Sequence, residues 1–237
     1  MVPPVPIRNC NRPRREKTKL PSISINSDIN INVDVDNDDF TLISSDNAIF
    51  TVPSYHLFAA SAVFRDAPSG GRRQVQFTDS DIERSDVLGS FVRLIMHGRL
   101  TREDYGPDPG IDAAHNRWAR LITFMQKWDC QGPLRTFTLC VSELLLRGEV
   151  ASLDAFVLGM LADDEELCVS ALKVRGPAGR PLRVDDVPFR TWQRVGARYM
   201  YALACAHGGV GRGNGWTDIS DAFRRHLSQT ERMVEAE

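Results

Sequence analysis

Three aspartates near the N-terminus are spaced like the first ligands of a calcium-binding loop. Asp34, Asp36 and Asp38 alternate with other residues, as the carboxylate ligands at the first, third and fifth positions of such a loop do. The sixth position is Asp39, where the turn of the loop requires glycine, and the twelfth is Ser45, where a bidentate glutamate completes the ligand set. We therefore do not expect a calcium ion here.

A glycine-rich run suggests a cradle for a phosphate group. Residues 208–215 read Gly-Gly-Val-Gly-Arg-Gly-Asn-Gly. The run follows a predicted helix, whereas phosphate-binding loops follow a strand, and it lacks the Lys-Ser/Thr pair of a P-loop. We interpret it as a flexible connector.

Histidines, cysteines and serines do not form a reactive constellation. The five histidines lie in unrelated segments, at His56, His97, His115, His207 and His226. The five cysteines lack the close pairing of a zinc or redox motif and are predicted to be buried free thiols: Cys10, Cys130, Cys140, Cys168 and Cys205. Ser61 and Ser142 lack a Gly-x-Ser-x-Gly context. We expect no catalytic residue, metal ion, cofactor or small-molecule substrate, so the protein is predicted not to be an enzyme.

Charge and hydropathy limit the kinds of molecule that the protein is expected to bind and the compartments in which it is expected to occur. The 29 basic and 31 acidic side chains leave a formal net charge of only -2, so no strong field attracts a nucleic acid or an anionic membrane. Neither a secretory signal nor an apolar stretch of roughly 18 residues is found. We expect a cytoplasmic or nuclear protein whose partner is another protein. The acidic group at residues 163–166 is typical of a helix start, with a free site for a basic partner as the alternative.

The first part of the chain alternates between tail and strand patterns. Residues 1–21 combine prolines with a basic cluster, which predicts a disordered tail or, alternatively, a nuclear-import signal and a transcription-associated role. From Ile23 to Val35, apolar residues alternate with polar ones, which predicts a strand or two short strands. Residues 40–43 and 48–52 predict a hairpin, because turn-forming residues separate them.

Most of the remaining chain has helical periodicity. Ser54 is predicted to cap a short helix that runs to about Phe64, and residues 75–77 are predicted to form a third strand. Asp79, Ser80 or Ser85 is predicted to cap the next helix, which ends near Gly98. Further helices are predicted at residues 118–128, 134–146, 153–161, 165–174, 187–206 and 217–234.

One segment resembles a known family. Residues 50–66, Phe-Thr-Val-Pro-Ser-Tyr-His-Leu-Phe-Ala-Ala-Ser-Ala-Val-Phe-Arg-Asp, are similar to the signature of the BTB/POZ family in the form common in fungal members. Lys127-Trp128-Asp129-Cys130 looks like the family's Lys-Tyr-Asp end of a core helix. The residues that carry this fold signature are Asp39, Phe50, Val52, Leu57, Ser61, Phe64, Gly98 and Trp128.

The resemblance implies a fold and a class of function. The implied fold is α+β, a small mixed sheet flanked by α-helices, over about residues 39–148. Together with the preceding β segment we predict one domain at residues 22–148, and the helical periodicity predicts a helical extension over residues 149–237. The implied function is that of a protein-interaction adaptor, which dimerises or docks onto a cullin-type ubiquitin ligase. We expect the partner surface to combine the alternating run with the first helix, through Ile29, Ile31, Val33, Tyr55 and Phe58.

Overall fold

The structure is a computed structural model, and it describes residues 39–66, 73–101, 104, 114–174, 179–187, 189–192, 196–209 and 216–235. The predicted tail, the alternating run from Ile23 to Val35 and the aspartates at positions 34, 36 and 38 lie outside the described residues. The predictions made for those segments therefore stay predictions.

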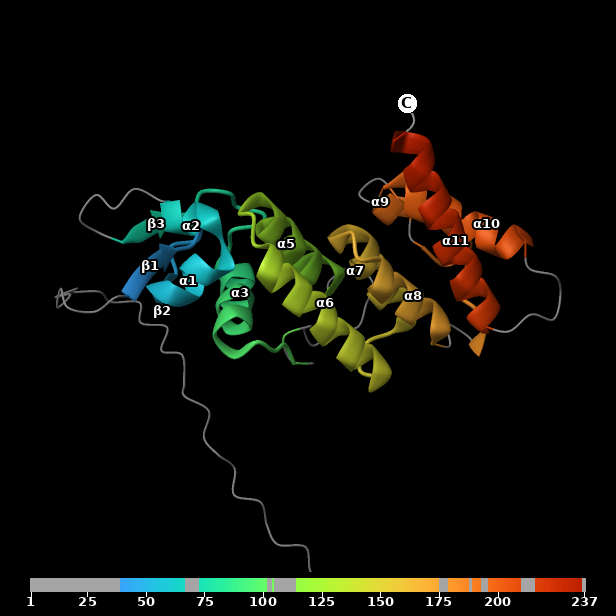
Figure 1. Ribbon diagram of the computed structural model, residues 1–237. Coiled ribbons are helices and arrows are strands. Elements are labelled where there is room, and N and C mark those ends of the chain that lie inside the picture. Colours follow the sequence, from blue (N-terminus) through green and yellow to red (C-terminus); the bar gives the residue numbers. More distant parts are fainter. Residues whose placement is uncertain are drawn as a thin grey trace, which may run out of the picture. The chain divides into compact units, whose positions relative to one another are not determined.

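A three-stranded mixed sheet opens the described chain (Figure 1). β1 (Asp39–Ile43) pairs with β2 (Ile49–Pro53) in antiparallel register, which confirms the predicted hairpin. Asn47 adopts a φ of 64° in the turn between them, a conformation that asparagine tolerates better than most residues. β3 (Gln74–Gln76) pairs with β1 in parallel, so the strand order is β2-β1-β3.

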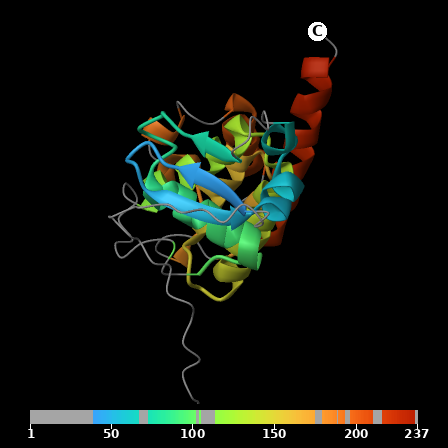
Figure 2. The same ribbon diagram turned by 90° about the vertical axis from the view of Figure 1, so that its left-hand side faces the viewer.

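Two short helices connect the hairpin to β3, and three longer helices follow the sheet. α1 (Ser54–Ala60) and α2 (Ala62–Asp66) lie between β2 and β3. The longer helices are α3 (Ser85–His97), α5 (Ala114–Lys127) and α6 (Gln131–Leu146). Figure 2 shows the three strands side by side in front of these helices.

Helices also make up the remainder of the chain. Its elements are α7 (Ser152–Ala162), α8 (Glu165–Lys173), the 3-10 helix η2 (Val184–Asp186), α9 (Phe189–Trp192), α10 (Ala197–Gly209) and α11 (Trp216–Glu235). α7 packs against α5, α6 and α8, and α11 packs against α8 and α10. The fold is therefore a mostly helical α+β arrangement with a small mixed sheet near the start of the described chain (Figure 1).

The ends of several elements differ from the prediction. The predicted helix from Ser54 to Phe64 is interrupted at Ser61, whose φ of -156° and ψ of 137° are extended. Ser54 is the first helical residue and does not cap α1 with its side chain, because Pro53 occupies the cap position. The predicted helix at residues 187–206 corresponds to two helices, α9 and α10.

The N-terminus of α3 is capped from a distant turn. None of the three predicted capping residues, Asp79, Ser80 and Ser85, fills the cap position, which belongs to Arg84. The carboxylate of Asp46, in the β1–β2 turn, instead accepts hydrogen bonds from the Ser85 N–H (2.8 Å) and the Ser85 hydroxyl (2.6 Å). Burial raises the pKa of Asp46, but hydrogen bonds from the Ser44 and Ser85 hydroxyls and the Ser85 amide outweigh this and lower it to about 2.

One buried cluster links the sheet to the helices. It contains Phe40, Leu42 and Val52 from the sheet and extends through all the longer helices. Val150 and the residues of α7 belong to the same cluster, so buried packing continues across the predicted boundary at residue 148. That boundary stays a prediction. Among the described helices, none is sufficiently long and apolar to span a lipid bilayer.

Candidate interaction surface

The helix pair α1–α2 presents an uncharged row of side chains to solvent. Tyr55 is 65% exposed and Val63 is 43% exposed, and Ala59 and Ala62 between them are also exposed. Phe58 is half-buried beside them. We call these five side chains the α1–α2 surface. Aromatic side chains such as that of Tyr55 are enriched at protein interfaces relative to the rest of the surface.

The local sequence explains how this surface forms. Pro53 ends β2, since it lacks the N–H that a further ladder bond would need, and its fixed φ leads the chain into α1. Ser61 then interrupts the helix, and its hydroxyl accepts a hydrogen bond from the Val63 N–H (3.0 Å) at the start of α2. The two helices are therefore short and separated by one extended residue.

The opposite side of the helix pair is buried. Leu57, Ala60 and Phe64 pack into the core, as the helical spacing of these residues predicts. Phe58 lies between the two sides: its ring meets that of Phe40 edge-on, with centroids 6.2 Å apart. The guanidinium of Arg73 lies 6.0 Å from the Phe58 centroid. Phe58 therefore belongs partly to the fold and only partly to the surface that we predicted for it.

Tyr55 is the most exposed aromatic side chain on α1. Its ring lies beside that of His56, with centroids 4.1 Å apart and an interplanar angle of 35°. His56 is half-buried and belongs to no metal-binding cluster within the described chain. Of the predicted partner residues, the structure thus brings Tyr55 and Phe58 together on α1, whereas Ile29, Ile31 and Val33 lie outside the described residues.

The sheet edge that precedes α1 is open on one side. The Thr41 N–H donates to the Arg73 carbonyl, and the Phe77 N–H donates to the Ile43 carbonyl. The backbone polar groups of Thr41 and Ile43 in β1 therefore point toward β3. Backbone polar groups alternate in direction along a strand, so those of the neighbouring residues in β1 point toward β2. In β2, the backbone polar groups of Ile49 and Thr51 point away from β1. Within the described residues, no strand pairs with this side of β2.

The remaining fold-signature residues are not part of the exposed row on α1 and α2. Val52 and Ser61 are buried, Phe50 and Trp128 are half-buried, and Asp39 begins β1. Gly98 ends α3 in the left-handed conformation with a φ of 62°, as its position after the apolar stripe predicts. These residues belong to the scaffold, whereas Tyr55, Ala59, Ala62 and Val63 are exposed within the described part of the chain.

The chain matched no family model, no curated protein and no solved structure.

A buried carboxylate lies below α2. The Glu83 side chain is 2% exposed, and its Oε2 accepts the Thr78 N–H (2.9 Å) and the Asp79 N–H (2.8 Å). Its Oε1 accepts the Trp128 indole N–H (3.0 Å) and lies 2.9 Å from Lys127 Nζ. Burial raises the pKa of Glu83, but these hydrogen bonds outweigh it and lower the pKa overall. Glu83 therefore stays ionised at neutral pH as a structural anchor.

The described cysteines and histidines have structural surroundings. Burial raises the pKa of Cys130 to about 12 and also raises the pKa values of Cys140 and Cys168, so these thiols do not supply thiolate nucleophiles at neutral pH. All three are buried and free, as the sequence predicts, whereas Cys205 is free but only half-buried, so the prediction of burial is wrong for this residue. Nε2 of His207 lies 2.6 Å from the Leu182 carbonyl oxygen. Within the described part of the chain, His, Cys, Asp and Glu side chains form no cluster that could hold a metal ion.

The acidic group at residues 163–166 is engaged by the chain itself. Asp164 caps α8 through the Leu167 N–H (2.8 Å), which confirms the predicted helix start. Asp163 accepts hydrogen bonds from Arg198 and from the Tyr199 hydroxyl. Glu165 and Glu166 both pair with one arginine of α11, Arg224. Each of these four carboxylates thus has an intramolecular partner, and the alternative of an acidic site for a basic partner stays a prediction.

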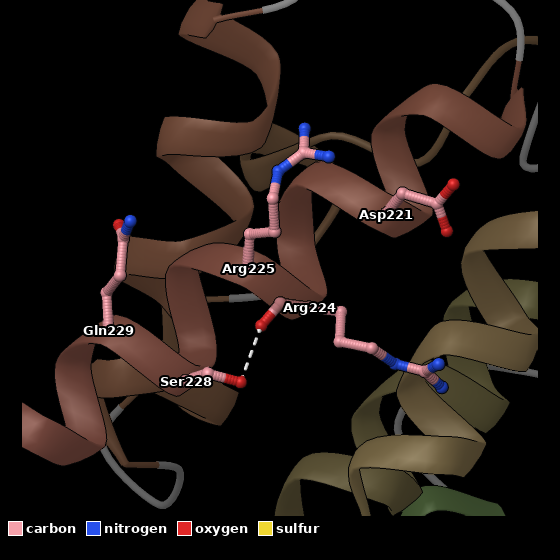
Figure 3. A pocket seen from close by; sticks show the side chains of 5 residues that line it. All are labelled: Asp221, Arg224, Arg225, Ser228 and Gln229. Atoms are coloured by element: carbon pink, nitrogen blue, oxygen red, sulfur yellow. Dashed lines mark hydrogen bonds between the residues drawn. The ribbon is translucent and has the colours of Figure 1, made fainter.

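A groove of about 500 Å³ runs along α11. Its lining comes from one helix: Asp221, Arg224, Arg225, Ser228 and Gln229 (Figure 3). Figure 3 shows the Arg224 side chain extending toward the neighbouring helix, where Glu166 holds its guanidinium with two hydrogen bonds of 2.7 Å. Because this arginine is occupied and all five lining residues are polar or charged, we assign no ligand to the groove.

Proposed function

We propose that the protein is a non-enzymatic adaptor that associates with a second copy of itself through the α1–α2 surface. The observation that carries the proposal is the exposure of Tyr55, at 65%, next to Ala59, Ala62 and Val63. Tyrosine is enriched among the residues that contribute most to binding. The resemblance of residues 50–66 to the BTB/POZ signature supports the same use.

The open side of β2 supports a second copy as the partner. Within the described residues, β2 and β3 occupy both sides of β1, and no strand pairs with the outer side of β2. An open strand edge favours pairing with another chain. In the proposed dimer, the alternating run predicted from Ile23 to Val35 pairs with the β2 edge of the second copy, which places Ile29, Ile31 and Val33 at the interface.

Replacing Tyr55 tests the proposal. We expect Tyr55→Ala to weaken self-association about tenfold, equivalent to about 1.4 kcal/mol, because the interface loses its aromatic anchor. Sedimentation velocity over a concentration series measures the dissociation constant. Tyr201→Ala is the matched control, since Tyr201 is a 57% exposed tyrosine on α10. A wild-type protein that stays monomeric at roughly tens of micromolar contradicts the proposal.

Recruitment of a cullin-type ligase subunit is the second candidate function. The observation that favours a second surface is the exposure of Leu139 (64%) and Leu146 (78%), which lie two turns apart on α6. Exposed leucines at this spacing suit the apolar face of a partner helix. We expect a cullin pull-down to recover the wild-type chain and to lose the variant with both leucines changed to aspartate. A pull-down in which the wild-type chain recovers no cullin removes this function.

A further inference from the structure

Helix α2 is held in place by Trp128, the residue that follows α5. The ring of Phe64 in α2 stacks on the Trp128 indole, with centroids 5.1 Å apart and an interplanar angle of 6°. The hydroxyl of Ser61, at the break between α1 and α2, donates a hydrogen bond to the Trp128 carbonyl at 2.5 Å. Two separate groups of Trp128, its ring and its carbonyl, therefore contact the α1–α2 pair.

Trp128 is itself anchored on its other side. Its indole N–H donates to Glu83, whose second carboxylate oxygen accepts two backbone N–H groups at residues 78 and 79. The neighbouring Lys127 ammonium lies 2.9 Å from the same carboxylate and 3.3 Å from that of Asp79. The orientation of the indole is thus fixed by a buried, charge-assisted network.

Helix α2 depends on these contacts because it is too short to be stable alone. It has five residues, fewer than an isolated helix needs to offset the entropy of nucleation. Val63, which belongs to the α1–α2 surface, donates its N–H to the same Ser61 oxygen that donates to Trp128. The position of the exposed row therefore follows from the position of Ser61 and Trp128.

We propose that Ser61 and Trp128 are positioning residues for partner binding: they set the angle between α1 and α2, and with it the shape of the α1–α2 surface, without touching the partner. The inference rests on the proposed self-association. Ser61 is buried and Trp128 is half-buried behind the exposed row, so a change at either residue alters the presentation of Tyr55 and Val63 without changing their chemistry.

Two conservative variants test the inference in the full-length protein. Ser61→Ala removes the hydroxyl that joins α2 to Trp128, and Trp128→Phe keeps an aromatic ring for stacking but removes the indole donor. We expect each variant to weaken self-association about tenfold, because Ser61→Ala removes the bond to the Trp128 carbonyl, Trp128→Phe removes the bond that orients the ring against Glu83, and the surface loses its fixed shape in both. We also expect faster amide hydrogen exchange at residues 54–66.

Matched controls separate positioning from general destabilisation. Ser90→Ala removes a buried serine hydroxyl of α3, which donates to the Asp86 carbonyl at 3.1 Å. Trp118→Phe removes the indole donor of a buried tryptophan near the other end of α5, which donates to the Asp104 carbonyl at 3.2 Å. We expect both controls to self-associate like the wild-type protein and to leave exchange at residues 54–66 unchanged.

The possible results distinguish this inference from the proposed function. A wild-type protein that self-associates, with Ser61→Ala and Trp128→Phe no weaker than their controls, overturns the positioning role and leaves the proposed function intact. A wild-type protein that does not self-associate overturns both. Weaker association of the two variants, with faster exchange confined to residues 54–66, supports the positioning role.

Discussion

Phe64→Ala is expected to lower the free energy of unfolding by about 3–5 kcal/mol, the range typical of deleting a buried phenylalanine ring. Phe64 is 0% exposed although it lies on a helix of only five residues. Its ring stacks on Trp128 and lies 6.5 Å from Phe77 and 6.3 Å from Phe91, measured between centroids. Removal of the ring leaves a cavity that α2 cannot fill, because Ser61 ties the start of this helix to Trp128.

Urea denaturation followed by circular dichroism measures this loss, since the fold is mostly helical. Val63→Ala is the control on the same helix: Val63 is 43% exposed, and its truncation is expected to change stability by no more than about 0.5 kcal/mol. Equal stabilities of the two variants would mean that α2 does not pack its phenylalanine into the core.

The sequence predicts the elements of this fold well where their signals are local. The hairpin follows from two β-rich runs around a turn at residues 44–47, and the structure places β1 and β2 there. Gly98 and Gly148 both adopt left-handed φ values, of 62° and 72°, at the predicted helix ends. Apolar spacing alone locates α3, α5, α6, α8 and α11, because each of these helices buries one side against neighbours. The segment predicted at residues 153–161 also forms a helix, α7, but nearly all of its residues are buried.

Features that depend on distant partners could not be predicted in the same way. The break at Ser61 is stabilised by a hydrogen bond to Trp128, 67 residues away, and the N-terminus of α3 is capped by Asp46, 39 residues before Ser85. A periodicity analysis of residues 54–64 therefore favours one continuous helix. Propensities describe only local preferences, and tertiary contacts override them at these two positions.

The candidate site was predictable in part for the same reason. The BTB/POZ-like signature directs attention to α1, but it does not distinguish the side of α1 that faces the core from the side that faces solvent. In the structure, Leu57 and Phe64 lie in the core and Tyr55 lies on the surface. Phe58 is half-buried and contacts Phe40. Trp128 belongs to the fold signature, but its contacts with Ser61 and Phe64 had no local sequence signal, and neither had the hydrogen bond from its indole to Glu83.

Gly159→Ala is expected to destabilise the protein by about 2 kcal/mol through overpacking between α7 and α8. A Cβ atom at this position would lie 2.7 Å from the Cys168 sulfur, 3.0 Å from the Cys168 backbone nitrogen and 3.2 Å from the Asp164 carbonyl oxygen. Two of these three atoms belong to the backbone at the start of α8, so a side-chain rotation cannot relieve the contacts. The whole of α8 would have to move away from α7.

A displacement of α8 would also affect helices other than α7. α11 packs against α8, and Arg224 of α11 pairs with Glu165 and Glu166 at the first turn of α8. We therefore expect Gly159→Ala to lower the unfolding midpoint in urea and to quicken amide exchange in α8 and α11, whereas α1 and α2 exchange as in the wild-type protein.

Gly132 is a matched control that distinguishes overpacking from a general effect of replacing glycine with alanine. At Gly132, in the first turn of α6, a Cβ atom would meet no other atom within 4 Å, so Gly132→Ala is expected to be neutral or to stabilise by up to about 1 kcal/mol. Combining Gly159→Ala with Cys168→Ala removes the closest of the three contacts and should restore part of the lost stability. A Gly159→Ala variant as stable as Gly132→Ala would contradict the close approach of α7 and α8, because alanine is otherwise the better helix former.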